Sequence, residues 1–399
     1  MSLRKKNLLI SRYVSTVLLS LFLVLFSLAC SKKEEAKNQQ ISQITQKFKE
    51  KLQVFQNDLG FPGATAAFVL PGGLSSSVAV GYSDVENKTE MKPTDRMPAG
   101  SVGKTFVAAL AILLAQEGKF NLDDKIKKWL GNEDWFPRLP ASEDITIRTL
   151  LNHRSGLKDH VFESQEFTRD IEKILSSDPD AIFPPEKLVS YVLDAPPLFK
   201  VGTDFHYSDT NYIIVGIIIE KATRSSYYNE LTQRLLAKFS LSNTLPADKR
   251  ELPGIIPGYI DPKSPFGSLA KKTVQEGRLL FNPQTEWTGG GLISTSEDLA
   301  RWAKLLYEGK LSEVPYLDEM LDRGSFPYGL GVGVRETELG IAYGHSGYFP
   351  GYRTAMGYFP AHKIAVAIQF NRDYDVGEHP SQLVELAKVV LEQLEPRVK

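Results

Sequence analysis

The strand-forming stretches of this chain lie near its two ends, and the middle is mainly helical. Two strands joined by a Pro-Gly-Gly turn are predicted within 64–82, and four more within 328–371. Apolar periodicity predicts helices at 41–59, 101–119, 212–223, 299–309 and 380–395. Both ends must therefore contribute to one antiparallel sheet, which predicts an α+β fold with helices on the sheet and a helical subdomain, about 142–285, inserted between them.

The composition is that of an ordinary globular protein. The chain has 399 residues, a formal net charge of −1 and 42% hydrophobic residues. This length suits one large or two ordinary domains. A charge close to zero gives no reason to expect nucleic acid as a partner.

The N-terminus has the pattern of an export signal. Arg4, Lys5, Lys6 and Arg12 precede an uncharged run from 13 to 29 that ends at Cys30. This stretch resembles the cleavage box of bacterial lipoproteins, with Cys30 as the acylated first residue, although Ser27 replaces the usual leucine. The alternative is an uncleaved signal anchor. Either way, we expect a signal at 1–30, a tether at 31–40 and an exported, membrane-attached domain at 41–399, facing the periplasm or the cell exterior.

The stretch PAGSVGKTFVAALAILLAQEGK, 98–119, permits two readings. Its GSVGKT part matches the end of a phosphate-binding loop, but Pro98 stands where that loop requires its first glycine. Proline offers no N–H to a phosphate, and the preceding residues are polar rather than a buried strand. The phosphate-loop interpretation is therefore rejected.

The other reading is a nucleophilic serine with a lysine one helical turn later. Ser101 and Lys104 share a helix face, and the positive helix N-terminus favours a serine alkoxide. The same field and burial both disfavour a protonated lysine, so Lys104 is a candidate base. The alternative is that Ser101 is an ordinary N-cap residue and Lys104 an ordinary surface lysine. The four residues 101–104 alone do not distinguish a catalytic pair from this structural one.

Two later motifs separate them. Tyr207-Ser208-Asp209 precedes an apolar helix, and His345-Ser346-Gly347 ends a predicted strand. The order Ser-x-x-Lys, Tyr-x-Asp, His-x-Gly resembles the penicillin-recognising serine hydrolases, in particular class C β-lactamases and D-Ala-D-Ala carboxypeptidases with their esterase and D-aminopeptidase relatives. The stretches PGATAAFV, LLNHRSGL, TGGGLISTSEDLARWAKLL and HSGYFPGYRT resemble the same family, over about 45–390.

The resemblance implies a β-lactamase/transpeptidase-like fold and a role for each motif residue. Ser101 would be acylated, and Lys104 and Tyr207 would share the proton transfers. His345 would face the site from the sheet, where other branches carry lysine. The backbone N–H groups of Ser101 and Tyr348, the latter just after Ser346-Gly347, would bind the oxyanion.

Two departures from the family pattern bear on the substrate. Asp209 replaces the usual asparagine, and a carboxylate cannot donate a hydrogen bond to a substrate carbonyl. His345 supplies less fixed positive charge than lysine for a substrate carboxylate. Arg353 is an alternative source of that charge, but we interpret it as a surface arginine.

Three functions remain open. The first is an acyl-serine hydrolase of D-amino-acid or D-Ala-D-Ala-like peptides, with cell-wall peptides among its candidate substrates. The second is a carboxylesterase or weak β-lactamase on the same scaffold, and the third is a non-catalytic, membrane-tethered binding protein. The intact set of Ser101, Lys104, Tyr207 and His345 argues against the third. No motif indicates a metal or another cofactor.

Overall fold

The computed structural model describes residues 37–264, 267 and 270–394. The predicted signal, Cys30 and most of the tether therefore lie outside the described residues. No helix in the described part of the chain is both long and apolar enough to cross a membrane. Residues 37–59 are helical, in agreement with the predicted helix at 41–59.

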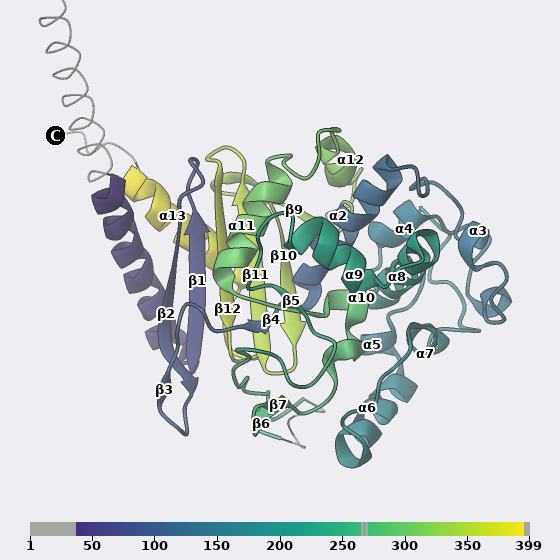
Figure 1. Cartoon of the computed structure of the whole chain (residues 1–399), viewed down its shortest axis with the longest axis horizontal. Helices are drawn as coiled ribbons and strands as arrows, with labels where there is room; N and C mark the ends of the chain where they lie inside the picture. Colours follow the sequence, from purple (N-terminus) through teal and green to yellow (C-terminus); the bar gives the residue numbers. More distant parts are fainter. Residues whose placement is uncertain (1–36, 265–266, 268–269, 395–399) are drawn as a thin grey trace, which may run out of the picture.

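A seven-stranded antiparallel sheet forms the centre of the molecule, in the order β3-β2-β1-β12-β11-β10-β9 (Figure 1). Strands from both ends of the chain meet within it, because β1 pairs with β12 in a register that places Ala67 opposite Ala367. The predicted α+β fold is thus confirmed. Its strands are β1 (Gly63–Val69), β2 (Ser75–Asp84), β3 (Thr89–Glu90), β9 (Gly333–Thr337), β10 (Gly340–Phe349), β11 (Tyr352–Phe359) and β12 (Ile364–Phe370).

Each face of the sheet covers a separate hydrophobic core. Alternate residues of β1, such as Ala66 and Phe68, pack with helix 37–59 and α13 (His379–Leu394). The residues between them face the other core, which contains α11 (Ser296–Tyr307) and α2 (Gly103–Gln116). Period-two alternation along buried strands therefore makes a three-layered molecule.

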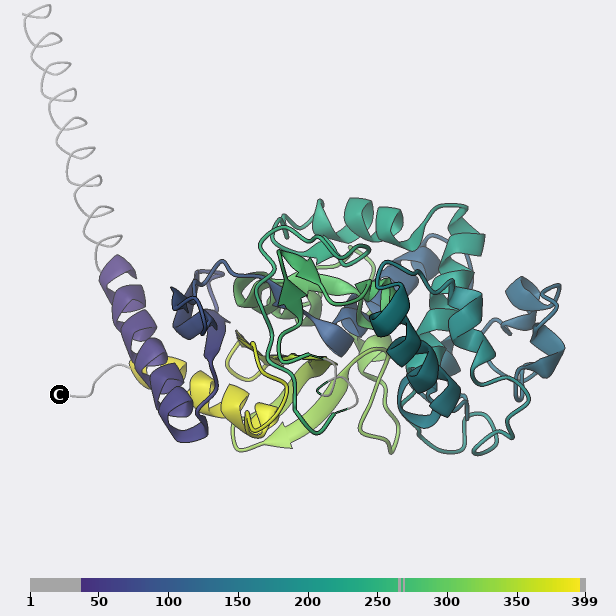
Figure 2. The same ribbon diagram turned by 90° about the horizontal axis from the view of Figure 1, so that it is seen from below.

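The remaining helices form a region at the opposite end from helix 37–59 and α13 (Figures 1 and 2). Its longest member is α8 (Asp209–Thr223), which is buried over most of its length and contacts α2. Both helices are apolar all round, as expected for helices enclosed on every side. The other helices of four or more residues are α3 (Lys127–Leu130), α4 (Ile147–Leu151), α5 (His160–Glu163), α6 (Gln165–Ser177), α7 (Pro185–Ser190), α9 (Tyr227–Leu231), η3 (Thr232–Leu236), α10 (Trp287–Gly290) and α12 (Leu317–Leu321).

Two local predictions were wrong. The sequence Ser294-Thr295-Ser296-Glu297 predicts a capping box before the helix at 299–309. That box does not form, because Thr295 caps α11 by accepting from the Asp298 N–H, while Glu297 accepts from Ser75 and Ser77 of β2. The strand predicted from 328 begins only at Gly333. Gly331 has a φ of +69°, outside the extended region, so residues 328–332 form a loop instead.

Candidate active site

Ser101 lies in a tight turn that leads into α2. The turn, η1 (Gly100–Val102), is a 3₁₀ helix, and Gly100 has a φ of +52°. A Cβ on Gly100 would lie 2.5 Å from the Tyr348 carbonyl oxygen, and one on Gly347 would lie 2.0 Å from the Ala99 carbonyl oxygen. Glycines at both positions therefore let strand β10 lie directly against the serine turn, and Ser346, Gly347 and Tyr348 line the same pocket as Ser101.

Lys104 reaches back to Ser101 from the first turn of α2. Its side chain is fully buried, and its Nζ donates to Ser101 Oγ over 3.1 Å. It also donates to Asp209, the first residue of α8, and to the carbonyl oxygen of Gly289. The residues brought together from three distant parts of the sequence therefore satisfy all three donors of the ammonium group.

The ion pair with Asp209 reverses the expected effect of burial on Lys104. Burial lowers the pKa of Lys104, but the negative charge of Asp209, together with Tyr207 and the hydrogen bond to Asp209, outweighs it, and the pKa lies above the ordinary value. The expectation that burial makes Lys104 a ready base is therefore wrong for the resting enzyme. Lys104 is an ammonium ion there, which stabilises negative charge on the Ser101 oxygen.

Tyr207 precedes α8 and lies beside this pair. Its ring centroid is 5.1 Å from Lys104 Nζ. Burial raises the pKa of its hydroxyl above the usual value, although Lys104 acts in the opposite direction. The hydroxyl is shielded from solvent, and no well-formed hydrogen bond reaches it from the described residues, which leaves it available to a reacting group.

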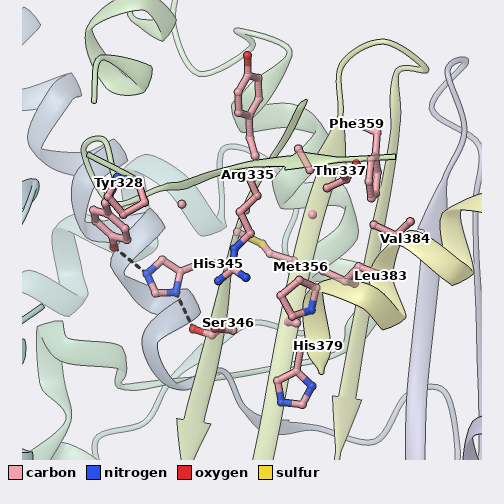
Figure 3. A pocket seen from close by; sticks show the side chains of 18 of the residues that line it. Tyr328, Arg335, Thr337, His345, Ser346, Met356, Phe359, His379, Leu383 and Val384 are labelled. Carbon is pink, nitrogen blue, oxygen red and sulfur yellow. Dashed lines mark hydrogen bonds between the residues drawn. The ribbon is translucent and has the colours of Figure 1, made fainter. Parts of the chain in front are cut away.

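His345 lies on β10 and is held by two hydrogen bonds (Figure 3). Its Nδ1 is 2.6 Å from the Ser346 carbonyl oxygen, and its Nε2 is 2.7 Å from the Tyr328 hydroxyl. A carbonyl only accepts, so Nδ1 carries the proton and Nε2 accepts from Tyr328. Burial and the nearby Lys104 lower the pKa of His345 to about 3, so the ring is neutral and brings no charge for a substrate carboxylate.

The pocket at Ser101, called the serine pocket below, has a volume of about 240 Å³. Aromatic side chains form much of its wall: Phe162, Phe167, Phe281 and Tyr348. Arg353 also lines it, lying 4.7 Å from the Tyr348 ring centroid and donating from Nε to the Asp373 carbonyl oxygen. Its interpretation as a mere surface arginine is therefore wrong.

The serine pocket contains one acidic group that the motifs did not reveal, and a second lies in contact with Asp209 outside the pocket lining. Glu286 lines it, half-buried, and burial together with the charge of Asp209 raises the pKa of this carboxyl to about 8. Next to Asp209, the Asp159 carboxylate accepts a hydrogen bond from the Asp209 N–H over 2.8 Å. Burial and the charge of Asp209 raise the pKa of Asp159 to about 7. Glu286 lies two residues before the TGGG sequence at 288–291, and this family-like stretch is the only feature of the sequence that points to Glu286.

Buried rings hold Tyr207 and His345 in place. His153, in the NHRSG stretch, lies with its ring centroid 4.2 Å from that of Tyr207 and 4.9 Å from that of Tyr328. Its Nδ1 accepts from the Ser208 N–H, which positions the chain just before α8. Among the described residues, no group of three or more His, Cys, Asp or Glu side chains could hold a metal ion.

A sequence profile of the β-lactamase family matches residues 44–391. The chain belongs to the β-lactamase family. Over 332 residues it is 27% identical to penicillin-binding protein 4* of Bacillus subtilis (strain 168), covering 78% of this chain and 68% of that protein. It is 24% identical to the D-aminopeptidase of Brucella anthropi, but the match covers 82% of this chain and only 59% of that relative.

A solved structure agrees with this membership of the β-lactamase family. The D-stereospecific amidohydrolase from Streptomyces sp. superposes with a TM-score of 0.73 and 26% identity, covering 86% of this chain and 97% of that one. The predicted family and the prediction of a serine hydrolase are both confirmed.

Proposed function

We propose that this serine hydrolase cleaves D-amino-acid amides and short peptides that carry a free terminal ammonium group, and esters of the same acyl groups. The observation that carries the proposal is the acidic wall of the serine pocket. Asp209 and Glu286 line it together with Ser101, and Glu286 has no cationic partner among the described residues. With a pKa of about 8, Glu286 is mostly protonated near pH 7 in the empty pocket; a substrate ammonium group beside it would favour its ionised form, and the resulting ion pair would select substrates that carry that group. The names of the similar D-aminopeptidase and D-stereospecific amidohydrolase support D-configured substrates.

The proposed reaction begins with an exchange of charge partners. A substrate ammonium near Asp209 and Glu286 offsets the negative charge that keeps Lys104 protonated, so the pKa of Lys104 falls. After Lys104 has released one proton to solvent, it accepts the proton of Ser101 as Oγ bonds to the substrate carbonyl carbon. The N–H groups of Ser101 and Tyr348 bind the oxyanion.

The second half of acylation releases the leaving amine. Tyr207 gives its hydroxyl proton to the amine nitrogen as the C–N bond breaks, and it takes back the proton held by Lys104. Water then attacks the acyl group, and the same residues pass its proton to Ser101 Oγ. Every proton removed from a nucleophile thus reaches a leaving group.

Turnover of paired substrates tests the proposal. We expect D-alanine p-nitroanilide to be cleaved at least about tenfold faster, in kcat/KM, than its N-acetyl derivative, since a paired charge contributes ~1.5 kcal/mol or more. It should also be cleaved faster than its L-enantiomer, which tests the D-configuration separately. Glu286→Gln should remove most of the preference for the free ammonium. Glu143→Gln, an exposed carboxylate paired with Lys127, is the matched control and should change nothing.

The same experiment separates the alternatives. Equal rates on the free and N-acetylated anilides would reject the ammonium role and favour a general esterase, which p-nitrophenyl acetate would reveal. Rapid hydrolysis of nitrocefin alone would favour a β-lactamase. A fluorophosphonate should label Ser101, and labelling that persists in Ser101→Ala would reject the nucleophile. Absence of turnover and of labelling would favour a binding protein.

A further inference from the structure

A second, larger cavity adjoins the serine pocket. It has a volume of about 520 Å³ and is called the sheet cavity here. Its floor consists of alternate residues on one face of neighbouring strands: Arg335 and Thr337 of β9, Ala342, Gly344 and Ser346 of β10, and Ala355, Gly357 and Phe359 of β11. Pro380, Leu383 and Val384 of α13 form a side wall (Figure 3).

The two cavities meet at the catalytic groups. Tyr207, His345 and Ser346 line both of them, whereas Ser101 and the carboxylates line only the serine pocket. Tyr207 is the residue proposed to protonate the leaving group. A leaving group that extends from the scissile bond past Tyr207 and His345 therefore enters the sheet cavity.

The lining of the sheet cavity defines what fits it. Small and apolar residues dominate the floor and the α13 wall. The basic side chains that line the cavity are Arg335, His345 and His379, and three tyrosines also line it: Tyr207, Tyr328 and Tyr343. The side chain of Arg335, an exposed residue of β9, forms no hydrogen bond or ion pair with the described residues (Figure 3). Burial is the main cause that lowers the pKa of His345 and of His379. The positive charge of Arg335 lowers both pKa values further.

We propose that the sheet cavity is the leaving-group subsite and that it selects large apolar leaving groups, with Arg335 favouring those that carry a carboxylate. The inference rests on the proposed function, because it takes Ser101 as the acylated residue. The acidic serine pocket holds the ammonium end of the substrate, and the cationic, apolar sheet cavity holds the other end. The preferred substrate is thus a short peptide with an aromatic or long aliphatic residue after the cleaved bond.

A series of D-alanyl amides tests the selectivity, with methylamine, 2-phenylethylamine or phenylalanine as the leaving group. We expect kcat/KM to rise about ten- to a hundredfold from the methylamide to the phenylethylamide, because the phenyl group leaves water. The kcat/KM of the phenylalanine derivative should be about fivefold higher than that of the phenylethylamide. Arg335→Gln should abolish only this fivefold difference.

A variant that fills the sheet cavity gives the decisive comparison. Ala342→Phe places a ring over the floor and should lower the phenylethylamide-to-methylamide ratio at least about tenfold. Ile341→Phe is the matched control, since the neighbouring strand residue points to the opposite face and is exposed. It should leave the ratio unchanged. An unchanged ratio in a folded Ala342→Phe protein, checked by thermal melting, would overturn the proposal.

A binding measurement keeps this proposal separate from the proposed function. In the Ser101→Ala protein, 4-phenylbutyrate should bind by calorimetry, and Ala342→Phe in the same background should abolish its binding. No binding would overturn the subsite even if amides are hydrolysed. Binding without turnover of any amide would instead overturn the proposed function and leave the cavity as an apolar-carboxylate site.

Discussion

Asp209 is the residue at which this chain departs most from the family pattern. In place of a neutral amide it puts a carboxylate against Lys104 Nζ, and the pKa of Lys104 rises. For a substrate without an ammonium group, this charge repels the carbonyl oxygen and holds the base protonated. The wild-type protein should therefore cleave activated esters readily and β-lactams poorly.

Asp209→Asn should raise the acylation rate of a penicillin relative to that of an activated ester. The expected gain is ~1–2 kcal/mol of barrier, about ten- to thirtyfold, because an ester needs less help from the site. Acylation rates for both substrates, measured on both proteins from pH 5 to 9, check this. An unchanged or lower ratio would show that the carboxylate does not act as a defective asparagine.

Tyr328 fixes the tautomer of His345 through a 2.7 Å hydrogen bond. Tyr328→Phe leaves Nε2 without its donor, so the neutral ring loses stabilisation and the pKa of His345 rises from about 3. We expect kcat to fall about tenfold and the acidic limb of the pH profile to move upward. Histidine ¹⁵N shifts should report the changed tautomer, and Tyr82→Phe, an exposed tyrosine, is the control. An unchanged pH profile would mean that Tyr328 only fills space.

Glu286 makes stability depend on pH in a specific direction. Its pKa is raised from 4.5 to about 8 in the folded protein, so its contribution is present below about pH 4.5 and is lost as pH rises through 8. Between pH 5 and 9 the wild type should lose ~1–3 kcal/mol more unfolding free energy than Glu286→Gln, which cannot ionise. Urea unfolding at both pH values measures this. Parallel losses in the two proteins would assign the effect to other groups, such as Asp159.

At the scale of elements, the contact between η1 and β10 brings together Ser101 and Tyr348, whose N–H groups are proposed to bind the oxyanion. Gly347→Ala would bring a Cβ within 2.0 Å of the Ala99 carbonyl oxygen, so β10 must move away from the serine turn. We expect acylation to fall at least about hundredfold, the effect of one lost oxyanion donor. Gly72→Ala is the control, because nothing lies within 4 Å of its added Cβ. Stopped-flow acylation distinguishes the two, and near-normal acylation of Gly347→Ala would contradict this role of the contact.

The elements that sequence could predict are those with a period or a motif. The apolar runs of α2 and α8 predicted two enclosed helices, and the residues at their starts, Ser101 and Asp209, were predicted with them. Tyr328 and Glu286 lie on irregular segments without periodicity, and only the folded chain brings them to the serine. The charge state of Lys104 depends on its contact with Asp209, 105 positions away, so the sequence predicts a protonated Lys104 only on the condition that the two residues meet.

At the scale of the whole molecule, the predicted lipid anchor at Cys30 lies outside the described residues and stays a prediction. Cys30→Ala should abolish metabolic palmitate labelling and release the protein from membranes, since one hydrophobic attachment then remains at most. Ser20→Ala, within the uncharged run, is the control. Mature protein with an intact Met1 would contradict the anchor.

The pairing of β1 with β12 also decides when this chain can fold. Ala67 meets Ala367 only after 300 further residues have been made, so the closing of the sheet is among the slowest contacts to form. Until then β1, an uncharged strand that is buried along its whole length in the native protein, has one edge without a partner. Such an edge invites pairing with other chains. A chain cut short before β12 should therefore aggregate rather than persist as a smaller enzyme.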